Sequence, residues 1–152
     1  MNTPLFVNST ITINAPADKV WDALTDPEQT KKYMFGCAAT SDYNVGSPLT
    51  WEGIFDGQLF IAVVGHIVAI VPNKQLIYTT FDPNDPAIED IPANYLTVTY
   101  TLTEENGQTR LDVNQGDFST VANSEKRYND ARNNGEGWNP ILVQIKALVE
   151  SV

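Results

Sequence analysis

The sequence carries few side chains that could perform acid–base or covalent chemistry. It contains one histidine, His66, and one cysteine, Cys37. General acid–base catalysis needs a titratable group within hydrogen-bond reach of its target. His66 lies in the apolar run Leu59–Val71, where alternation puts it on one face with Phe60 and Ala62, so we interpret it as a structural or surface residue. Cys37 has no base nearby in the sequence and is interpreted as a small buried hydrophobe. No catalytic residue is therefore assigned, and a non-enzymatic role is favoured.

The sequence also lacks the residue patterns that are typical of metal and cofactor sites. One cysteine and one histidine cannot assemble a zinc site, and a single cysteine cannot form an internal disulfide. The segment Asp82–Pro92 contains three prolines and four acidic residues, but their spacing does not match a calcium loop. We interpret this segment as a solvated surface loop. There is no glycine-rich phosphate loop, so we expect no metal and no cofactor.

Length, composition and charge limit the classes of protein that remain. The 152 residues suit one domain, residues 1–152, and apolar residues make up 42% of them. Nine Lys and Arg against nineteen Asp and Glu give a net charge of −10, which disfavours nucleic acid and anionic membranes as partners. No apolar run reaches the ~18 residues that a membrane helix needs. No secretory signal is visible, so the expected location is cytoplasmic.

The first third of the chain predicts one strand followed by two short helices. Leu5–Ile13 alternates between apolar and polar residues, which is typical of a strand. Pro16 suits the first position of a helix, and Val20 and Leu24 follow at helical spacing. Pro27 begins a second short helix that continues to about Tyr33.

The middle of the chain predicts a meander of antiparallel strands. Asn94–Thr103 alternates so that one face is apolar and the other polar, which indicates a sheet packed on one side. Asp56-Gly57 and Asn106-Gly107 are typical hairpin turns. The expected strands are Ser47–Gly53, Gln58–Val71, Gln75–Phe81, Asn94–Thr103 and Thr109–Gln115.

The C-terminal segment predicts a helix with one apolar face. Pro140 either begins this helix after Asn139 or kinks a longer helix that starts near Val121. We favour the kinked long helix. The apolar face consists of Trp138, Ile141, Leu142, Ile145, Leu148 and Val149.

This order of elements resembles the helix-grip fold of the START and birch-pollen-allergen (SRPBCC) superfamily, and within it the heat-shock-protein ATPase activator homologue-like domains. The resemblance implies an α+β fold: a curved antiparallel sheet of about seven strands wrapped around a long C-terminal helix, with two short helices after strand 1. One departure is Tyr33-Met34-Phe35, where family members often carry a tryptophan pair. The matching residues are 13–17, 20–27, 45–48, 65–68, 72, 76–78, 107–111, 135–138, 142, 145–146 and 148.

Such a fold leaves a gap between the sheet and the C-terminal helix, and aromatic side chains are expected to line it. Mostly apolar gaps with a few polar groups are typical of small-molecule sites. Tyrosine hydroxyls and the indole N–H groups of Trp51 and Trp138 would orient a guest. The same residues could equally fill the interior as ordinary core. The expected ligand-binding residues are Tyr33, Phe35, Trp51, Phe55, Phe60, Tyr78, Tyr100, Trp138 and Leu142.

Three functions remain open at this point. The first, which we favour, is non-enzymatic binding of a hydrophobic small molecule, either a lipid or an aromatic metabolite. The second is a protein-interaction module: the family name implies a chaperone partner, and the apolar run Leu59–Val71 favours a homodimer because an exposed apolar row needs cover. The third, implied by superfamily relatives, is a cyclase-type enzyme that uses His66, Tyr78 or Tyr100 for proton transfer.

Overall fold

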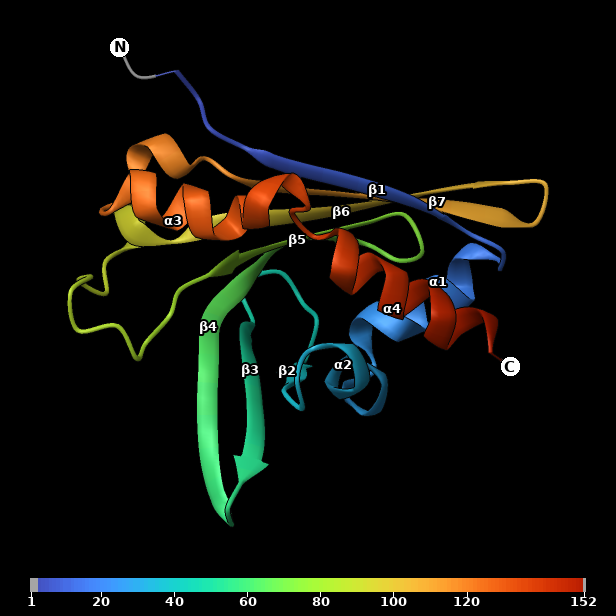
Figure 1. Cartoon of the computed structure of the whole chain (residues 1–152). Coiled ribbons are helices and arrows are strands. Elements are labelled where there is room, and N and C mark those ends of the chain that lie inside the picture. The colour runs from blue at the N-terminus through green and yellow to red at the C-terminus, as the bar shows by residue number, and fades with distance from the viewer. Residues whose placement is uncertain (1–2, 152) are drawn as a thin grey trace.

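The computed structural model describes residues 3–151 and shows a curved seven-stranded antiparallel sheet with helices gathered on one side (Figure 1). The strand order is β1-β7-β6-β5-β4-β3-β2. This architecture confirms the predicted α+β helix-grip fold. Its main elements are β1 (Val7–Ile13), α1 (Ala17–Thr25), α2 (Pro27–Tyr33), β2 (Ala38–Ser41), β3 (Pro48–Phe55), β4 (Gln58–Val71), β5 (Gln75–Thr80), β6 (Leu96–Glu105), β7 (Gln108–Gly116), α3 (Ser124–Arg132) and α4 (Asn139–Glu150).

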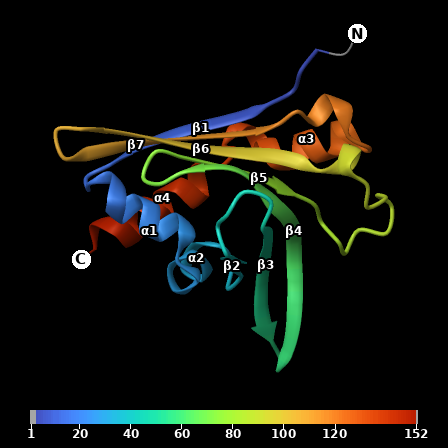
Figure 2. The same cartoon turned by 180° about the vertical axis from the view of Figure 1, so that it is seen from behind.

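Helices α1 and α2 form the predicted pair after β1. Pro16 occupies the N-cap of α1, and Pro27 occupies the first turn of α2. The side chain of Asp26 caps α2 by accepting a hydrogen bond from the Glu28 backbone N–H at 3.0 Å. The views from the two sides show α1, α2 and α4 on the same side of the sheet, with the β3–β4 hairpin extending beside them (Figures 1 and 2).

Two tight turns set the register of the predicted hairpins. Asp56 and Gly57 join β3 to β4, and Asn106 and Gly107 join β6 to β7. All four have positive φ, between 52° and 79°. A two-residue turn of this kind matches the twist of the flanking strands, and Asp, Asn and Gly are the residues that adopt it at low cost.

Two β-bulges make strand β4 change its inward-facing side twice. Opposite β3 the register skips Ala62, and opposite β5 it skips Val68. A bulge bends the strand that carries it. Figure 1 shows β4 bending away from the rest of the sheet, with the paired strand β3 running alongside it. At the bend the strands approach closely: a Cβ on Gly65 would lie 1.7 Å from the Thr79 carbonyl oxygen.

The bulge at Ala62 also corrects the expected position of the histidine. His66 does not share a face with Phe60 and Ala62, because the extra residue reverses the side on which every later side chain lies. His66 is exposed, and its Nδ1 is hydrogen-bonded to Thr79 Oγ1 at 3.1 Å. The interpretation of His66 as a surface residue is thus confirmed.

The C-terminal helix is present, but the expectation that it begins near Val121 and continues through a kink is wrong. Asn133 and Asn134 adopt left-handed backbone conformations with φ of 47° and 57°, and they end the helical path after α3. Pro140 lies in the first turn of α4, where its missing N–H costs nothing. Helix α4 buries Leu142 and Ile145 against the core and packs on β1 and α1.

The acidic, proline-rich segment Asp82–Pro92 is irregular, as predicted. Prolines interrupt it at three positions and remove the donors that a central strand would need. Its middle is not wholly solvated, because Ile88 is buried. Among residues 3–151, no helix is long and apolar enough to span a membrane.

Candidate functional site

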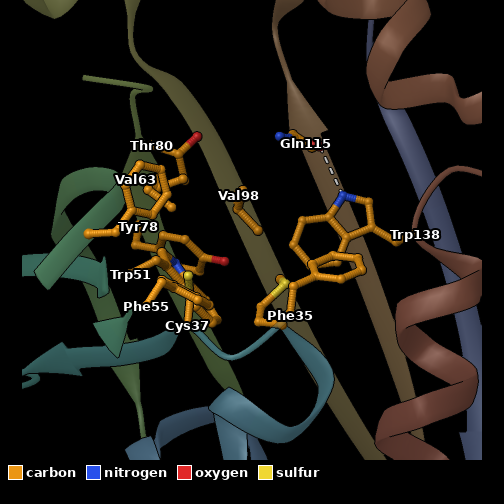
Figure 3. A pocket seen from close by; sticks show the side chains of 13 residues that line it. Phe35, Cys37, Trp51, Phe55, Val63, Tyr78, Thr80, Val98, Gln115 and Trp138 are labelled. Atoms are coloured by element: carbon orange, nitrogen blue, oxygen red, sulfur yellow. Dashed lines mark hydrogen bonds between the residues drawn. The ribbon is translucent and has the colours of Figure 1, made fainter. Parts of the chain in front are cut away.

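A cavity of about 410 Å³ lies on the inner side of the bend in the sheet (Figure 3). Strands β3, β4 and β5 supply one wall, and the connection from α2 to β2 supplies another. The residue just before α4 closes the far side. The lining residues are Met34, Phe35, Cys37, Trp51, Phe55, Phe60, Ala62, Val63, Tyr78, Thr80, Val98, Gln115 and Trp138.

The structure brings six of the nine expected site residues to the cavity wall. Alternation in β3 and β5 turns Trp51 and Tyr78 inward, toward the core side of the sheet. The six residues at the wall are Phe35, Trp51, Phe55, Phe60, Tyr78 and Trp138.

The other three expected residues lie in the packed core behind this wall. Tyr33 donates its hydroxyl to the Ala23 carbonyl oxygen at 2.7 Å, and this bond fixes α2 against α1. The Tyr100 hydroxyl is hydrogen-bonded to that of Tyr78 at 2.7 Å. Leu142 is fully buried beneath α4. Their expected placement at the site is therefore corrected.

The position of the cavity relative to the C-terminal helix also differs from the expectation. The site was predicted between that helix and the sheet. None of the cavity-lining residues belongs to α4, and Trp138, which directly precedes α4, is the nearest contribution. The reason is that Leu142, Ile145 and Val149 fill the space beneath the helix with their own side chains.

Seven lining residues were missed, and alternation could have identified some of them. Thr80 lies two residues after Tyr78 and Val98 two before Tyr100, so each faces the same side as an expected site residue. Gln115 lies at the end of the predicted strand Thr109–Gln115. Ala62 lies two residues after Phe60 and carried the same signal, whereas Val63 carried none because the bulge at Ala62 breaks the alternation. Met34 and Cys37 lie in a connection without a repeating pattern.

The cavity is uncharged. No Lys, Arg, His, Asp or Glu belongs to its lining, and no cluster of metal-ligating side chains occurs in the described part of the chain. Burial raises the pKa of the Tyr78 hydroxyl well above its usual value, and the Tyr100 hydroxyl beside it raises that pKa further. Burial also raises the pKa of the Cys37 thiol. At neutral pH these groups are therefore protonated, and Tyr78 is a hydrogen-bond donor rather than a base.

The family model described as "Activator of Hsp90 ATPase homolog 1-like protein" matches residues 14–150. The chain belongs to this family. A solved structure from Cytophaga hutchinsonii, ChR145, is 33% identical with a TM-score of 0.76, and the match covers 99% of this chain and 97% of that one. MLL2253 from Mesorhizobium loti is 25% identical with a TM-score of 0.72, over 97% of this chain and 98% of that one. These findings confirm the predicted superfamily. No curated protein matches.

More distant members of the same fold include a protein of a biosynthetic locus. DynU16, from the dynemicin biosynthetic locus, is 17% identical with a TM-score of 0.72. The match covers 98% of this chain and 48% of that one. At this identity the likeness concerns the fold alone.

In this member of the Activator of Hsp90 ATPase homolog 1-like family, the mouth of the cavity is apolar and exposed. Phe35 is 79% exposed, and Phe55 and Phe60 contact each other edge to face with ring centroids 6.1 Å apart. Ile54 and Leu59 are also exposed, and they pair across the same hairpin on the face opposite Phe55 and Phe60. We call these five residues the hairpin patch. It places unburied aromatic rings directly beside the opening.

Proposed function

We propose that this protein binds a hydrophobic small molecule, a lipid or an aromatic metabolite, in the cavity at the bend of the sheet. The observation that carries the proposal is the volume of about 410 Å³ that the chain leaves unfilled among aromatic side chains. Small-molecule sites commonly measure ~300–1,000 Å³ and are mostly apolar. Burying ~200 Å² of apolar ligand surface would contribute about 5 kcal/mol before the entropy of association is subtracted.

The binding role needs no catalytic step. The enzyme alternative relied on His66, Tyr78 and Tyr100. Of these, Tyr78 alone lines the cavity, and its raised pKa keeps the hydroxyl protonated. A protonated tyrosine can act only as an acid, and the cavity lining contains no His, Asp, Glu or Lys to act as the base. Binding without turnover is therefore the function we favour.

An uncharged fluorescent probe, N-phenyl-1-naphthylamine, tests the proposal. We expect its fluorescence to rise on saturable binding to one site. Ala62 lines the cavity, so Ala62→Phe should fill part of it and weaken binding at least about tenfold, the effect of roughly 1.4 kcal/mol. Ala87→Phe adds the same volume in an exposed loop and should leave binding unchanged. Absence of saturable binding, or equal affinity in both variants, would contradict the proposal.

A second candidate function is binding of a protein partner or a second copy of the chain. The observation that favours it is the hairpin patch, in which Leu59 is 60% and Ile54 67% exposed. Exposed apolar side chains gathered at one hairpin are typical of an interaction site. Sedimentation velocity of the purified protein tests this alternative, because a self-paired protein should sediment as a dimer.

A further inference from the structure

The two tryptophans of the cavity wall differ in how their indole N–H groups are used. Trp138 donates to Gln115 Oε1 at 2.9 Å. Trp51 is 6% exposed, and its N–H has no hydrogen-bond partner within residues 3–151. The nitrogen is not fully enclosed by neighbouring atoms, and Trp51 lines the cavity. An indole N–H is a donor only, and one without a protein acceptor can donate to a guest in the cavity.

A second donor lies on the same wall. The hydroxyls of Tyr78 and Tyr100 are 2.7 Å apart and share one hydrogen bond. Each hydroxyl carries one proton, so one of the two protons has no acceptor in this pair. Tyr100 is enclosed in the core, whereas Tyr78 lines the cavity. When Tyr100 donates to Tyr78, the Tyr78 proton is free to face a guest.

The absence of charged side chains from the cavity lining restricts which acceptor groups a ligand can bring to these two donors. A carboxylate or phosphate in the cavity would be buried without a cation, because the lining contains none, and the chain carries a net charge of −10. An ammonium group would equally lack a carboxylate partner. A neutral oxygen satisfies the donors without burying a charge.

We propose that the ligand is an uncharged, largely apolar molecule with a carbonyl or ether oxygen, which accepts hydrogen bonds from Trp51 Nε1 and the Tyr78 hydroxyl. This inference rests on the proposed binding function. Figure 3 shows Trp51 and Tyr78 on the wall across the cavity from Trp138. The oxygen would therefore lie toward β3 and β5, and the apolar body would face Phe35 and Trp138.

Three compounds that share one naphthalene body test the inference by competition with N-phenyl-1-naphthylamine. They are 2-acetylnaphthalene, which has a neutral acceptor; 2-ethylnaphthalene, which has none; and 2-naphthoate, which is an anion. We expect the ketone to bind about three- to tenfold more tightly than the hydrocarbon, the worth of one net hydrogen bond. The anion should bind most weakly.

The two tryptophans supply a matched pair of variants. Trp51→Phe should reduce the preference for the ketone, because only the Tyr78 hydroxyl remains as a donor. Trp138→Phe should retain the full preference, because the Trp138 N–H is already paired. Equal affinity of ketone and hydrocarbon, tightest binding of naphthoate, or a preference that Trp51→Phe leaves undiminished would overturn the inference while leaving hydrophobic binding intact. If Trp51→Phe does not fold, the ligand series on the unmodified chain decides. Failure of every compound, the probe included, would instead overturn the proposed function itself.

Discussion

The indole N–H of Trp138 donates to the side-chain oxygen of Gln115 across 2.9 Å, and this bond ties the start of α4 to strand β7. The backbone N–H of Trp138 also donates to Ser9 Oγ at 3.1 Å, on β1. The Trp138 ring packs edge to face on Tyr100, with centroids 6.0 Å apart. Trp138 and Gln115 line a second hollow of about 510 Å³ under α3 as well. The pair therefore forms a partition between the aromatic cavity and the α3 side of the molecule.

Removing the acceptor of this bond should weaken the partition. In Gln115→Leu the Trp138 N–H loses its partner, so we expect a loss of about 1–2 kcal/mol in the free energy of unfolding. Urea denaturation measures it. Gln108→Leu, at an exposed position of the same strand, is the control and should change stability by less than about 0.5 kcal/mol. Equal stability of the two variants would show that the bond contributes nothing.

Two tyrosines with buried hydroxyls should respond in opposite ways to loss of the hydroxyl. Tyr33→Phe leaves the Ala23 carbonyl oxygen unpaired in the core, so we expect a loss of about 1–2 kcal/mol in unfolding free energy. The Tyr43 hydroxyl is buried with no partner among the described residues, and Tyr43→Phe should be neutral or stabilising. Thermal denaturation of both variants compares them directly. Since Tyr33 does not line the cavity, Tyr33→Phe should leave probe affinity unchanged.

The carboxylate of Asp117 should make stability depend on pH in the acid range. Its Oδ1 accepts from the Leu5 backbone N–H at 2.8 Å and from the Ser119 N–H and hydroxyl, and these bonds lower its pKa below the usual 3.8. A pKa that is lower in the folded state stabilises the protein above the unfolded pKa. The stabilisation is lost as pH falls through the folded pKa.

The variant Asp117→Asn isolates this effect. We expect the unmodified protein to be more stable than the variant at pH 6, and the two unfolding free energies to converge as the pH falls below about 4. Asp42→Asn, at an exposed position, is the control. A difference between Asp117→Asn and the unmodified protein that stays constant from pH 6 to pH 3 would exclude the proposed titration.

Local sequence patterns predicted the sheet and the helix pair because each element carries its own signal. Alternation in Asn94–Thr103 predicted β6 with one packed face, and Asn106-Gly107 predicted the turn from β6 to β7. The bulge at Ala62 carries no such signal, since it depends on how β4 curves against its neighbours. That single residue decides which side of β4 faces the cavity, so the site could be predicted less well than the fold.

The end of the chain illustrates the same limit. Pro140 is compatible both with a kink and with the start of a helix, and the apolar face of α4 is identical in either case. Asn133 and Asn134 decide the outcome by adopting left-handed conformations, which asparagine tolerates better than most residues. Tyr33 likewise could not be assigned to core or cavity from its type, because the acceptor at Ala23 comes from tertiary packing.

The hairpin patch should decide between a monomer and a self-paired protein. If the patch pairs with a second copy, sedimentation velocity should show a concentration-dependent dimer, and Leu59→Asp should convert it to monomer by placing a charge in the apolar contact. Val143→Asp, at a position of α4 that is 50% exposed, is the matched control and should leave the dimer intact. Because Leu59 lies outside the set of cavity-lining residues, neither variant should reduce probe binding by more than about twofold. A monomer at high concentration would exclude self-pairing. The exposed rings of the patch would then act only as part of the cavity wall.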